Sequence, residues 1–164
     1  MNASPKPNAL RWLWLTALVI ALDQLTKAWV RADIRPGELV PVISHFWYWT
    51  LAFNKGAAFS FLAHDGGWQR WLFTALAIVI SAGLTVWLSR TPRRDWRTAL
   101  PLALVIGGAL GNLIDRLIAG QVTDFVLLFF GSYAYPAFNV ADSAITVGAV
   151  LLVAFGLFSR TGTD

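Results

Sequence analysis

The sequence predicts an α-helical membrane protein with four transmembrane helices, and three observations carry this prediction. Of the 164 residues, 57% are apolar and 13% are charged, whereas soluble domains average about 45–50% and about 25%. The apolar residues gather in four segments of the length that crosses a bilayer, which is about 20 residues. A cluster of arginines lies between the second and third of these segments, on the side of the membrane that would also hold both termini and their basic residues.

The four predicted spans cover about residues 10–30, 71–88, 99–118 and 141–158. The first resembles a cleavable signal peptide, because Lys6 and Arg11 precede its apolar run. No small-residue cleavage site follows that run, so we expect a retained span. The length of the chain indicates a single domain, residues 1–164, rather than several.

The positive charges also predict how the chain is oriented. Lys6 and Arg11 precede the first span, Arg160 follows the fourth, and a cluster of arginines separates the second span from the third: Arg90, Arg93, Arg94 and Arg97. With four spans, these places share one side, which the positive-inside rule makes cytoplasmic. Both termini are then cytoplasmic, and the segments 31–70 and 119–140 lie outside. The modest net charge of +4 fits this orientation and gives no indication of nucleic-acid binding.

The outer segment 31–70 is predicted to contain a small β-element on the membrane surface. Leu39 to Ile43 and Phe46 to Phe53 are rich in β-branched and aromatic residues, and Ser44-His45 is a turn candidate between them. Aromatic side chains of this segment are candidates for contact with the bilayer interface: Trp47, Trp49, Phe59 and Phe61. They can equally be interfacial residues without a binding role.

Two carboxylates in the spans have structural interpretations. Asp23 lies deep in the first span, where an acidic side chain is costly. Lys27 follows four residues later, so the two side chains can pair on one helix face. Asp115 adjoins Arg116 near the outer end of the third span, and we interpret both as a packing or ion-pair element. Gly107 and Gly111, with small side chains four residues apart, would let another helix approach closely.

Two further carboxylates are candidates for chemistry. Asp124 precedes the apolar run Phe125 to Phe130, and desolvation there would raise its pKa. Asp142 stands at the outer start of the fourth span, where Asn139 is a natural N-cap and an acid suits the helix dipole. The predicted topology brings both to one depth. Two carboxyl groups whose surroundings separate their pKa values make an acid–base pair that can activate water.

Other chemistries have weaker support in the sequence. Cysteine is absent, and the two histidines, His45 and His64, lie far apart without a metalloprotease motif. A Ser–Lys pair of Ser60 and Lys55 is conceivable, but an exposed lysine would keep its proton. Two alternatives to an enzyme remain open: an ion carrier that uses the intramembrane acids, and a scaffold assembled through the glycine face of the third span.

Five blocks in order give the chain a family resemblance. They are Asp23-Gln-Leu-Thr-Lys27, Asn54-Lys-Gly-Ala-Ala-Phe-Ser60, Gly107-Gly-Ala-Leu-Gly-Asn-Leu-Ile-Asp-Arg116, Val122-Thr-Asp-Phe125 and Phe138-Asn-Val-Ala-Asp-Ser143. Each block alone is weakly specific. Together, in a chain of this size, they resemble the bacterial lipoprotein signal peptidases (signal peptidase II), a family of membrane aspartyl peptidases.

The resemblance implies a fold, an activity and a location. It implies four helices with both ends cytoplasmic, a small periplasmic β-cradle, and an active site on the outer side of the bacterial cytoplasmic (inner) membrane. It implies removal of the signal peptide from prolipoproteins, with cleavage just before a diacylglyceryl-modified cysteine. It implies no metal or organic cofactor, and inhibition by cyclic peptide antibiotics such as globomycin. We expect a monomer in contact with membrane lipid.

The resemblance also assigns residues. The catalytic aspartates of the family match Asp124 and Asp142. Its supporting or substrate-binding residues match the following positions: Asp23, Asn54, Gly108, Asn112, Asp115, Arg116 and Asn139. The outer aromatic segment would then hold the lipidated cysteine and could move as a lid.

Overall fold

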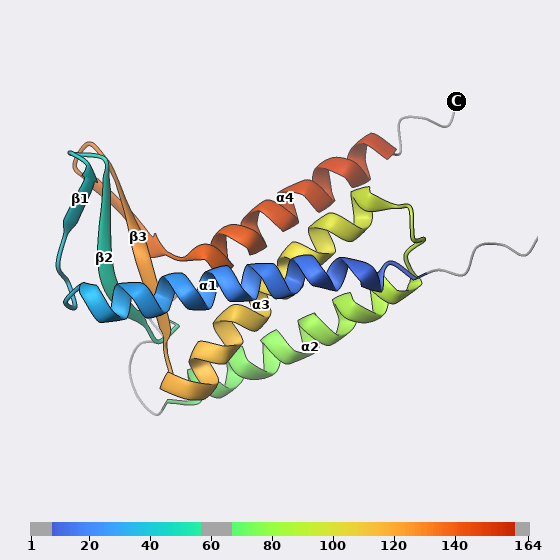
Figure 1. Ribbon diagram of the computed structural model, residues 1–164, viewed down its shortest axis with the longest axis horizontal. Coiled ribbons are helices and arrows are strands. Elements are labelled where there is room, and N and C mark those ends of the chain that lie inside the picture. The colour runs from blue at the N-terminus through green and yellow to red at the C-terminus, as the bar shows by residue number, and fades with distance from the viewer. Residues whose placement is uncertain (1–7, 57–66, 160–164) are drawn as a thin grey trace, which may run out of the picture.

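In the computed structural model, which describes residues 8–56 and 67–159, long helices form a bundle with a small sheet at one end (Figure 1). The helices are α1 (Leu13–Asp33), α2 (Trp68–Arg90), α3 (Trp96–Ala119) and α4 (Val140–Ser159), and a short 3-10 helix, η1 (Leu10–Trp12), precedes α1. The strands are β1 (Val40–Ile43), β2 (Trp47–Asn54), β3 (Val122–Phe130) and β4 (Tyr133–Phe138).

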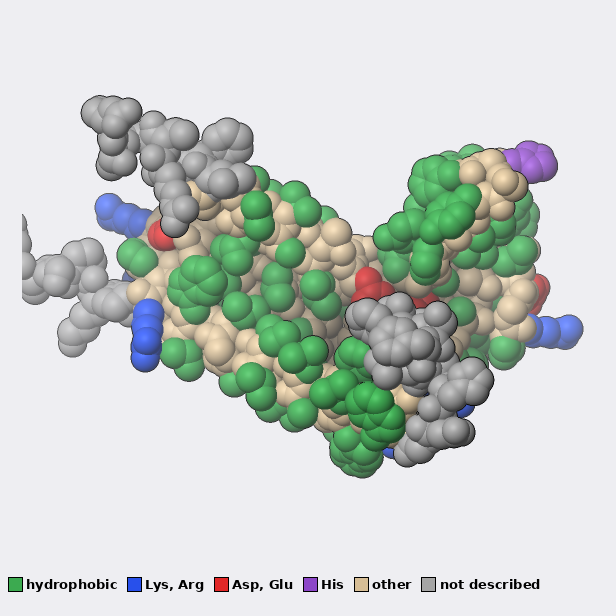
Figure 2. All heavy atoms as spheres, turned by 180° about the vertical axis from the view of Figure 1, so that it is seen from behind, with side chains coloured by type: hydrophobic (Ala, Val, Ile, Leu, Met, Phe, Trp, Pro, Cys, Tyr) green, Lys and Arg blue, Asp and Glu red, His purple; other side chains and the backbone are tan. Residues whose placement is uncertain are grey.

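Each predicted span corresponds to one of these helices. Three of them, Leu10–Asp33 (η1 with α1), α2 and α3, are long and apolar enough to cross a bilayer. The apolar part of α4, Val140–Gly156, is shorter. Much of the helical surface is covered by exposed apolar side chains (Figure 2), as expected where lipid replaces water as the solvent. The chain is therefore a mostly helical, membrane-embedded protein with a small antiparallel sheet.

The end of the bundle opposite the sheet holds the connections that the sequence predicts to share one side of the membrane. The start of α1, the α2–α3 connection and the end of α4 lie away from the sheet (Figure 1). There Ala9, Leu88 and Ala99 belong to one buried apolar cluster, and Arg11 Nη2 donates to the carbonyl oxygen of Arg93 at 2.9 Å. The places predicted to share a side of the membrane thus share an end of the bundle. Lys6 and Arg160 lie outside the described residues.

The sheet combines a predicted hairpin with two strands that the sequence interpretation missed. Strands β1 and β2 flank Ser44-His45 as expected, and His45 adopts a positive φ of 64°. The strand order is β1-β2-β3-β4, with every neighbouring pair antiparallel. The segment 119–140 was expected only as an outer connection, but it supplies β3 and β4. Its β-branched and aromatic run does carry a strand signal.

A small apolar cluster fixes the sheet on the C-terminal end of α1. Phe125 of β3 is buried with Leu51 of β2 and with Val30 and Ile34 at the end of α1. Strand alternation turns Asp124, the preceding residue, to the opposite face from Phe125. Burial of Phe125 against α1 therefore fixes the direction in which Asp124 points.

Glycines of α3 let two helices approach it closely. A Cβ atom added at Gly107 would lie 2.8 Å from Cβ of Val19 on α1, and one added at Gly108 would clash with the carbonyl oxygen of Ala141 on α4. A Cβ at Gly111 would lie 2.8 Å from Oδ2 of Asp23. The predicted small-residue face is thus used within this chain, as in other tightly packed membrane helices. This finding leaves the scaffold hypothesis without a free glycine face.

We predict that Gly108→Ala destabilises the protein, because the new methyl group must push α4 away from α3. Overpacking of this kind costs about 1–3 kcal/mol. The matched control is Gly83→Ala in α2, where an added Cβ meets nothing within 4 Å. Thermal unfolding of the purified protein should show a lower Tm for the first variant and an unchanged or slightly higher Tm for the second. Equal Tm values would contradict the close α3–α4 packing.

Candidate active site

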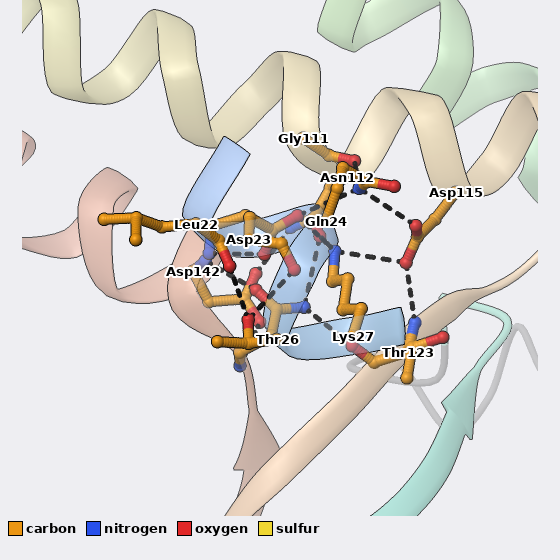
Figure 3. Close-up of polar contacts among 12 residues, drawn as sticks. Leu22, Asp23, Gln24, Thr26, Lys27, Gly111, Asn112, Asp115, Thr123 and Asp142 are labelled. Atoms are coloured by element: carbon orange, nitrogen blue, oxygen red, sulfur yellow. Dashed lines mark hydrogen bonds and ion pairs between the residues drawn. The ribbon is translucent and has the colours of Figure 1, made fainter. Parts of the chain in front are cut away.

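A buried lysine lies at the centre of the polar network at the sheet end of the bundle (Figure 3). Nζ of Lys27 is 2.8 Å from Oδ2 of Asp23 and 3.1 Å from Oδ2 of Asp115, and both the Lys27 and Asp23 side chains are 0% exposed. The predicted Asp23–Lys27 pair is confirmed. Asp115 is an ion-pair residue as interpreted, with Lys27 as its close partner and Arg31 at 3.9 Å.

The two carboxylates of this cluster have further hydrogen-bond donors. Asp23 Oδ1 accepts from the backbone N–H of Ala141 at 2.9 Å, and Asp115 Oδ2 accepts from that of Thr123 at 3.0 Å. Nε2 of Gln24 donates to both carboxylates, at 3.1 and 3.2 Å. Buried charges are tolerated when their remaining lone pairs are satisfied in this way. The cluster therefore ties α1 and α3 to the starts of β3 and α4.

Asp142 is held at the N-terminus of α4 by reciprocal capping. Its backbone N–H donates to Oδ1 of Asn139 at 2.8 Å, and its Oδ2 accepts from the backbone N–H of Asn139 at 3.3 Å. The predicted N-cap role of Asn139 is thus confirmed. Asp142 Oδ1 accepts from Nδ2 of Asn112 on α3 at 2.7 Å. Both carboxylate oxygens of Asp142 therefore face N–H donors.

Asp124 meets the same network from the sheet. Its Oδ1 accepts from Nδ2 of Asn139 at 2.7 Å, and its Oδ2 accepts from Nδ2 of Asn54 at 3.1 Å. Asn54 ends β2 opposite Val122 of β3, so Asp124 is its diagonal neighbour on one face of the sheet, within reach of its side chain. Asn139 thus contacts both aspartates and links the sheet to α4.

Three asparagine amides present their NH2 groups to the two aspartates. In each, the amide oxygen accepts a hydrogen bond from another group: Gly56 N for Asn54, Asp142 N for Asn139, and Lys27 Nζ for Asn112, at 2.8, 2.8 and 2.9 Å. An amide whose oxygen is engaged by a donor can offer only its NH2 group on the other side. The site is therefore organised to hold negative charge on the aspartate pair.

Burial has a strong effect on Asp124, which lies on the sheet outside the helices. Loss of solvent, followed by the neighbouring charge of Asp142, raises the pKa of the Asp124 carboxyl from 3.8 to about 7. The hydrogen bonds from Asn54 and Asn139 and the charge of Lys27 act in the opposite direction and are included in that value. Two nearby carboxyl groups in a desolvated site share protons in this way. The raised pKa therefore lets the Asp124 carboxyl hold a proton close to neutral pH.

The structure brings most of the candidate residues into one network. Asp23, Asn54, Asn112, Asp115 and Asn139 connect to Asp124 and Asp142 through the contacts above. The remaining two candidates sit beside this network. Gly108 packs under α4, and Arg116 donates from Nη1 to the carbonyl oxygen of Asn112 at 3.4 Å while its guanidinium lies 5.2 Å from the centre of the Phe73 ring.

Sequence reasoning did not list Lys27, Gln24 or Thr123 among the site residues. The four-residue spacing from Asp23 indicated that Lys27 takes part in an ion pair. Thr123 contributes through its backbone N–H, which any residue type would supply, so its side chain gave no signal in the sequence. Phe59, Ser60, Phe61 and His64 lie outside the described residues. Within residues 8–56 and 67–159, no three His, Cys, Asp or Glu side chains are grouped so as to hold a metal ion.

The surface is hollowed between the helical bundle and the sheet. Figure 2 shows acidic side chains at the base of this hollow, with apolar side chains on both of its flanks. An opening of this kind gives a polar site access from the surface while its surroundings stay apolar. The geometry suits a water-dependent reaction at the edge of the membrane helices.

Comparison with known proteins agrees with the resemblance of the motifs. Residues 15–158 match the model of the signal peptidase (SPase) II family. The chain is 57% identical over 162 residues to the lipoprotein signal peptidase of Xanthomonas oryzae pv. oryzae (strain PXO99A), which covers 99% of this chain and 98% of that protein. It is 56% identical over 158 residues to that of Xylella fastidiosa (strain M12), covering 96% and 95%.

Solved structures have the same fold. One, described as "Bacterial membrane enzyme structure by the in meso method at 2.3 A resolution", superposes with a TM-score of 0.79 at 29% identity and covers 98% of this chain and 95% of the other. A second, solved by the same method at 1.9 Å, has a TM-score of 0.78 at 29% identity, covering 93% and 96%. On the family match and the full-length relatives, the chain belongs to the signal peptidase II family.

Proposed function

We propose that this protein is a lipoprotein signal peptidase that uses Asp124 and Asp142 as a water-activating pair. Membership of the signal peptidase II family makes it a protease that processes lipoproteins. The observation that carries the catalytic assignment is the convergence of three asparagine NH2 groups on these two carboxylates, one of which has its pKa raised to about 7.

The proposed reaction begins with one proton on the pair, carried by Asp124. The ionised Asp142 takes a proton from a water molecule, whose oxygen attacks the scissile carbonyl carbon, and Asp124 gives its proton to the carbonyl oxygen. The resulting diol then returns one proton to Asp124. The proton on Asp142 passes to the leaving amine as the carbon–nitrogen bond breaks. The pair ends with the single proton with which it began, as acid–base catalysis by two carboxyl groups requires.

The substrate fits the position of the pair. We propose that the scissile bond precedes a diacylglyceryl-modified cysteine, and that the signal peptide enters beside the bundle from the membrane. The hollow between bundle and sheet would admit the cleavage site, and the apolar flanks would contact the lipid chains (Figure 2). The peptide backbone would meet polar side chains at the hollow's edge. Globomycin-type cyclic peptides would compete with the substrate for the same hollow. The active form of the protein is a monomer.

The topology is part of the same proposal. All four helices cross the inner membrane, the arginine-rich α2–α3 connection is cytoplasmic, and the sheet with the aspartate pair faces the periplasm. The α2–α3 connection lies at the end opposite the sheet (Figure 1), and it holds Arg93 and Arg94 shortly after Arg90, the last residue of α2. This placement of positive charge supports the orientation. The rival ion-carrier function would need acids free to change protonation across the depth of the bilayer. Asp23, the deep acid, is instead paired with Lys27, which favours the peptidase.

Asp124→Asn and Asp142→Asn should each abolish cleavage of a lipidated prolipoprotein peptide by the purified protein. Either change removes the carboxylate pair but keeps the shape of the side chain, so the protein should insert and fold. We expect kcat to fall by at least about 10³-fold, as for other residues that act as a catalytic unit. Substantial cleavage by either variant, with an unfolding transition like that of the wild type, would refute the pair.

The raised pKa of Asp124 predicts how stability depends on pH. Between pH 3.8 and about 7 the folded protein binds this proton and the unfolded chain does not, so stability should fall as pH rises through this window and level off above it. The drop in Tm from about pH 5 to about pH 8 should be smaller in Asp124→Asn than in the wild type. Asp33→Asn, at an exposed carboxylate of α1, is the matched control and should keep the wild-type drop. Equal drops in wild type and Asp124→Asn would contradict the raised pKa.

Asp23→Asn should lower stability and reduce cleavage only in part. Loss of a buried ionic partner costs about 3–5 kcal/mol, and the remaining contact of Lys27 with Asp115 lowers that cost here. The measurements are Tm and kcat for the same preparation. A well-folded Asp23→Asn protein that is as inactive as the two pair variants would make Asp23 part of the chemistry.

A further inference from the structure

We propose that Lys27 is a positioning residue of the reaction: its ammonium group fixes the side-chain amide of Asn112 so that the NH2 group, and not the oxygen, faces Asp142. The inference rests on the proposed function of Asp124 and Asp142 and extends it to a residue that the reaction scheme leaves unused. It is carried by a chain of two short contacts, Lys27 to Asn112 and Asn112 to Asp142.

The geometry of Asn112 allows one orientation. Its Oδ1 accepts from Nζ of Lys27 at 2.9 Å and from Nδ2 of Asn139 at 3.1 Å, and its Nδ2 donates to Oδ1 of Asp142 at 2.7 Å. An ammonium group has three donors and no acceptor. Rotating the amide by half a turn would set NH2 against two donors and an oxygen against a carboxylate. All three hydrogen bonds would be lost together.

Lys27 itself is held in place. Its side chain is fully buried, and its ammonium group lies between Asp23 on the same helix and Asp115 on α3. Its contact with Asn112 is also buried. A charge held on two sides by carboxylates presents its remaining proton in a fixed direction. The fixed position of Lys27 therefore determines the orientation of the Asn112 amide, and the amide does not determine the position of Lys27.

Asn112 differs from the other two asparagines in what fixes it. The oxygens of Asn54 and Asn139 accept from backbone N–H groups, those of Gly56 and Asp142. The oxygen of Asn112 accepts from side chains, chiefly from the charged group of Lys27. Substitution of Lys27 would leave the oxygen of Asn112 with one donor, the NH2 group of Asn139, which Thr123 and Asp124 also share. The amide of Asn112 is therefore loosened, whereas the other two keep their backbone donors.

Release of the amide has a specific consequence for the reaction. With its oxygen toward Asp142, Asn112 would repel the ionised carboxylate that must accept the proton from water. The charged groups around the pair are Lys27 and Asp23 on α1 and Asp115 and Arg116 on α3. Among them Lys27 hydrogen-bonds to the Asn112 side chain. In a Lys27 variant we therefore expect kcat to fall and the acid limb of the kcat–pH profile to move to higher pH. KM should stay within about twofold, because Lys27 is buried away from the substrate.

The test is a double-mutant cycle of Lys27→Met and Asn112→Ala, with cleavage of a lipidated prolipoprotein peptide by the full chain in detergent. Lys27→Met should lower kcat by about 10- to 100-fold in the wild-type background, within the range of coupling between contacting residues. In the Asn112→Ala background the same change should lower kcat by no more than about twofold. Equal factors in the two backgrounds would overturn the inference, because Lys27 would then act without Asn112.

Two further variants separate positioning from charge. Arg31→Met removes a cation one turn along α1 that is 36% exposed, lies 3.9 Å from Asp115, and donates to Oγ1 of Thr123 at 3.1 Å. It should leave the acid limb of the kcat profile in place, and a shift equal to that of Lys27→Met would overturn the positioning role. Lys27→Gln keeps a donor for Asn112 without the charge and should recover part of the lost kcat. If the kcat of Lys27→Gln is no higher than that of Lys27→Met, the result counts against the positioning role of Lys27.

The cycle remains decisive if Lys27→Met alone unfolds. In the Asp23→Asn background, Lys27→Met restores the net charge that the buried cluster has in the wild type, and the cycle is repeated there with Tm measured for each protein. The proposed function fails separately, through cleavage by Asp124→Asn or Asp142→Asn. If those variants are inactive and the cycle is additive, only the role of Lys27 is wrong.

Discussion

The buried ion pairs of Lys27 with Asp23 and Asp115 are the interactions on which the rest of the site depends. One ammonium group joins carboxylates from α1 and α3. Those carboxylates in turn accept from the backbone N–H groups of Thr123 and Ala141, the second residues of β3 and α4. Four segments, α1, α3, β3 and α4, meet at this point. Because a charge inside an apolar bundle is tolerated only with its partners, the cluster forms in this arrangement or is strongly destabilising. The positions of Asp124 and Asp142 therefore depend on how the Lys27 cluster holds β3 and α4 against α1 and α3.

Close packing and the charge cluster support each other. Gly111 leaves the space that Asp23 occupies, and Gly108 lets Ala141 approach α3 so that its N–H reaches Asp23. At the other side of the site, Phe125 of β3 is buried against the end of α1, so Asp124 is turned toward Asn54 and Asn139. Desolvation by these same elements raises the pKa of Asp124 to about 7. This burial costs stability, but it also keeps on Asp124 the proton that the proposed peptidase reaction needs.

The sequence predicts those features that depend on neighbouring residues. The apolar lengths predicted the helices, β-branched and aromatic residues predicted β1 and β2, and the four-residue spacing predicted the Asp23–Lys27 pair. Strands β3 and β4 were missed because the run Phe125 to Phe130 was interpreted only as an apolar setting for Asp124. The contacts of Lys27 with Asn112 and of Asp115 with Lys27 join residues far apart in the chain, which no local pattern encodes. The reaction itself came from the family resemblance, not from the spacing of carboxylates.

The most direct test of the account is the infrared spectrum of the protein in detergent as pH is varied, because the C=O stretch of a protonated carboxyl group is distinct from that of a carboxylate. We expect a protonated-carboxyl band that is lost with a midpoint near pH 7, because burial raises the pKa of Asp124 to about 7. The same band should persist in Asp33→Asn and be absent from Asp124→Asn. A band that remains unchanged in Asp124→Asn, or no titration near pH 7 in the wild type, would contradict the claim that Asp124 holds the proton of the pair.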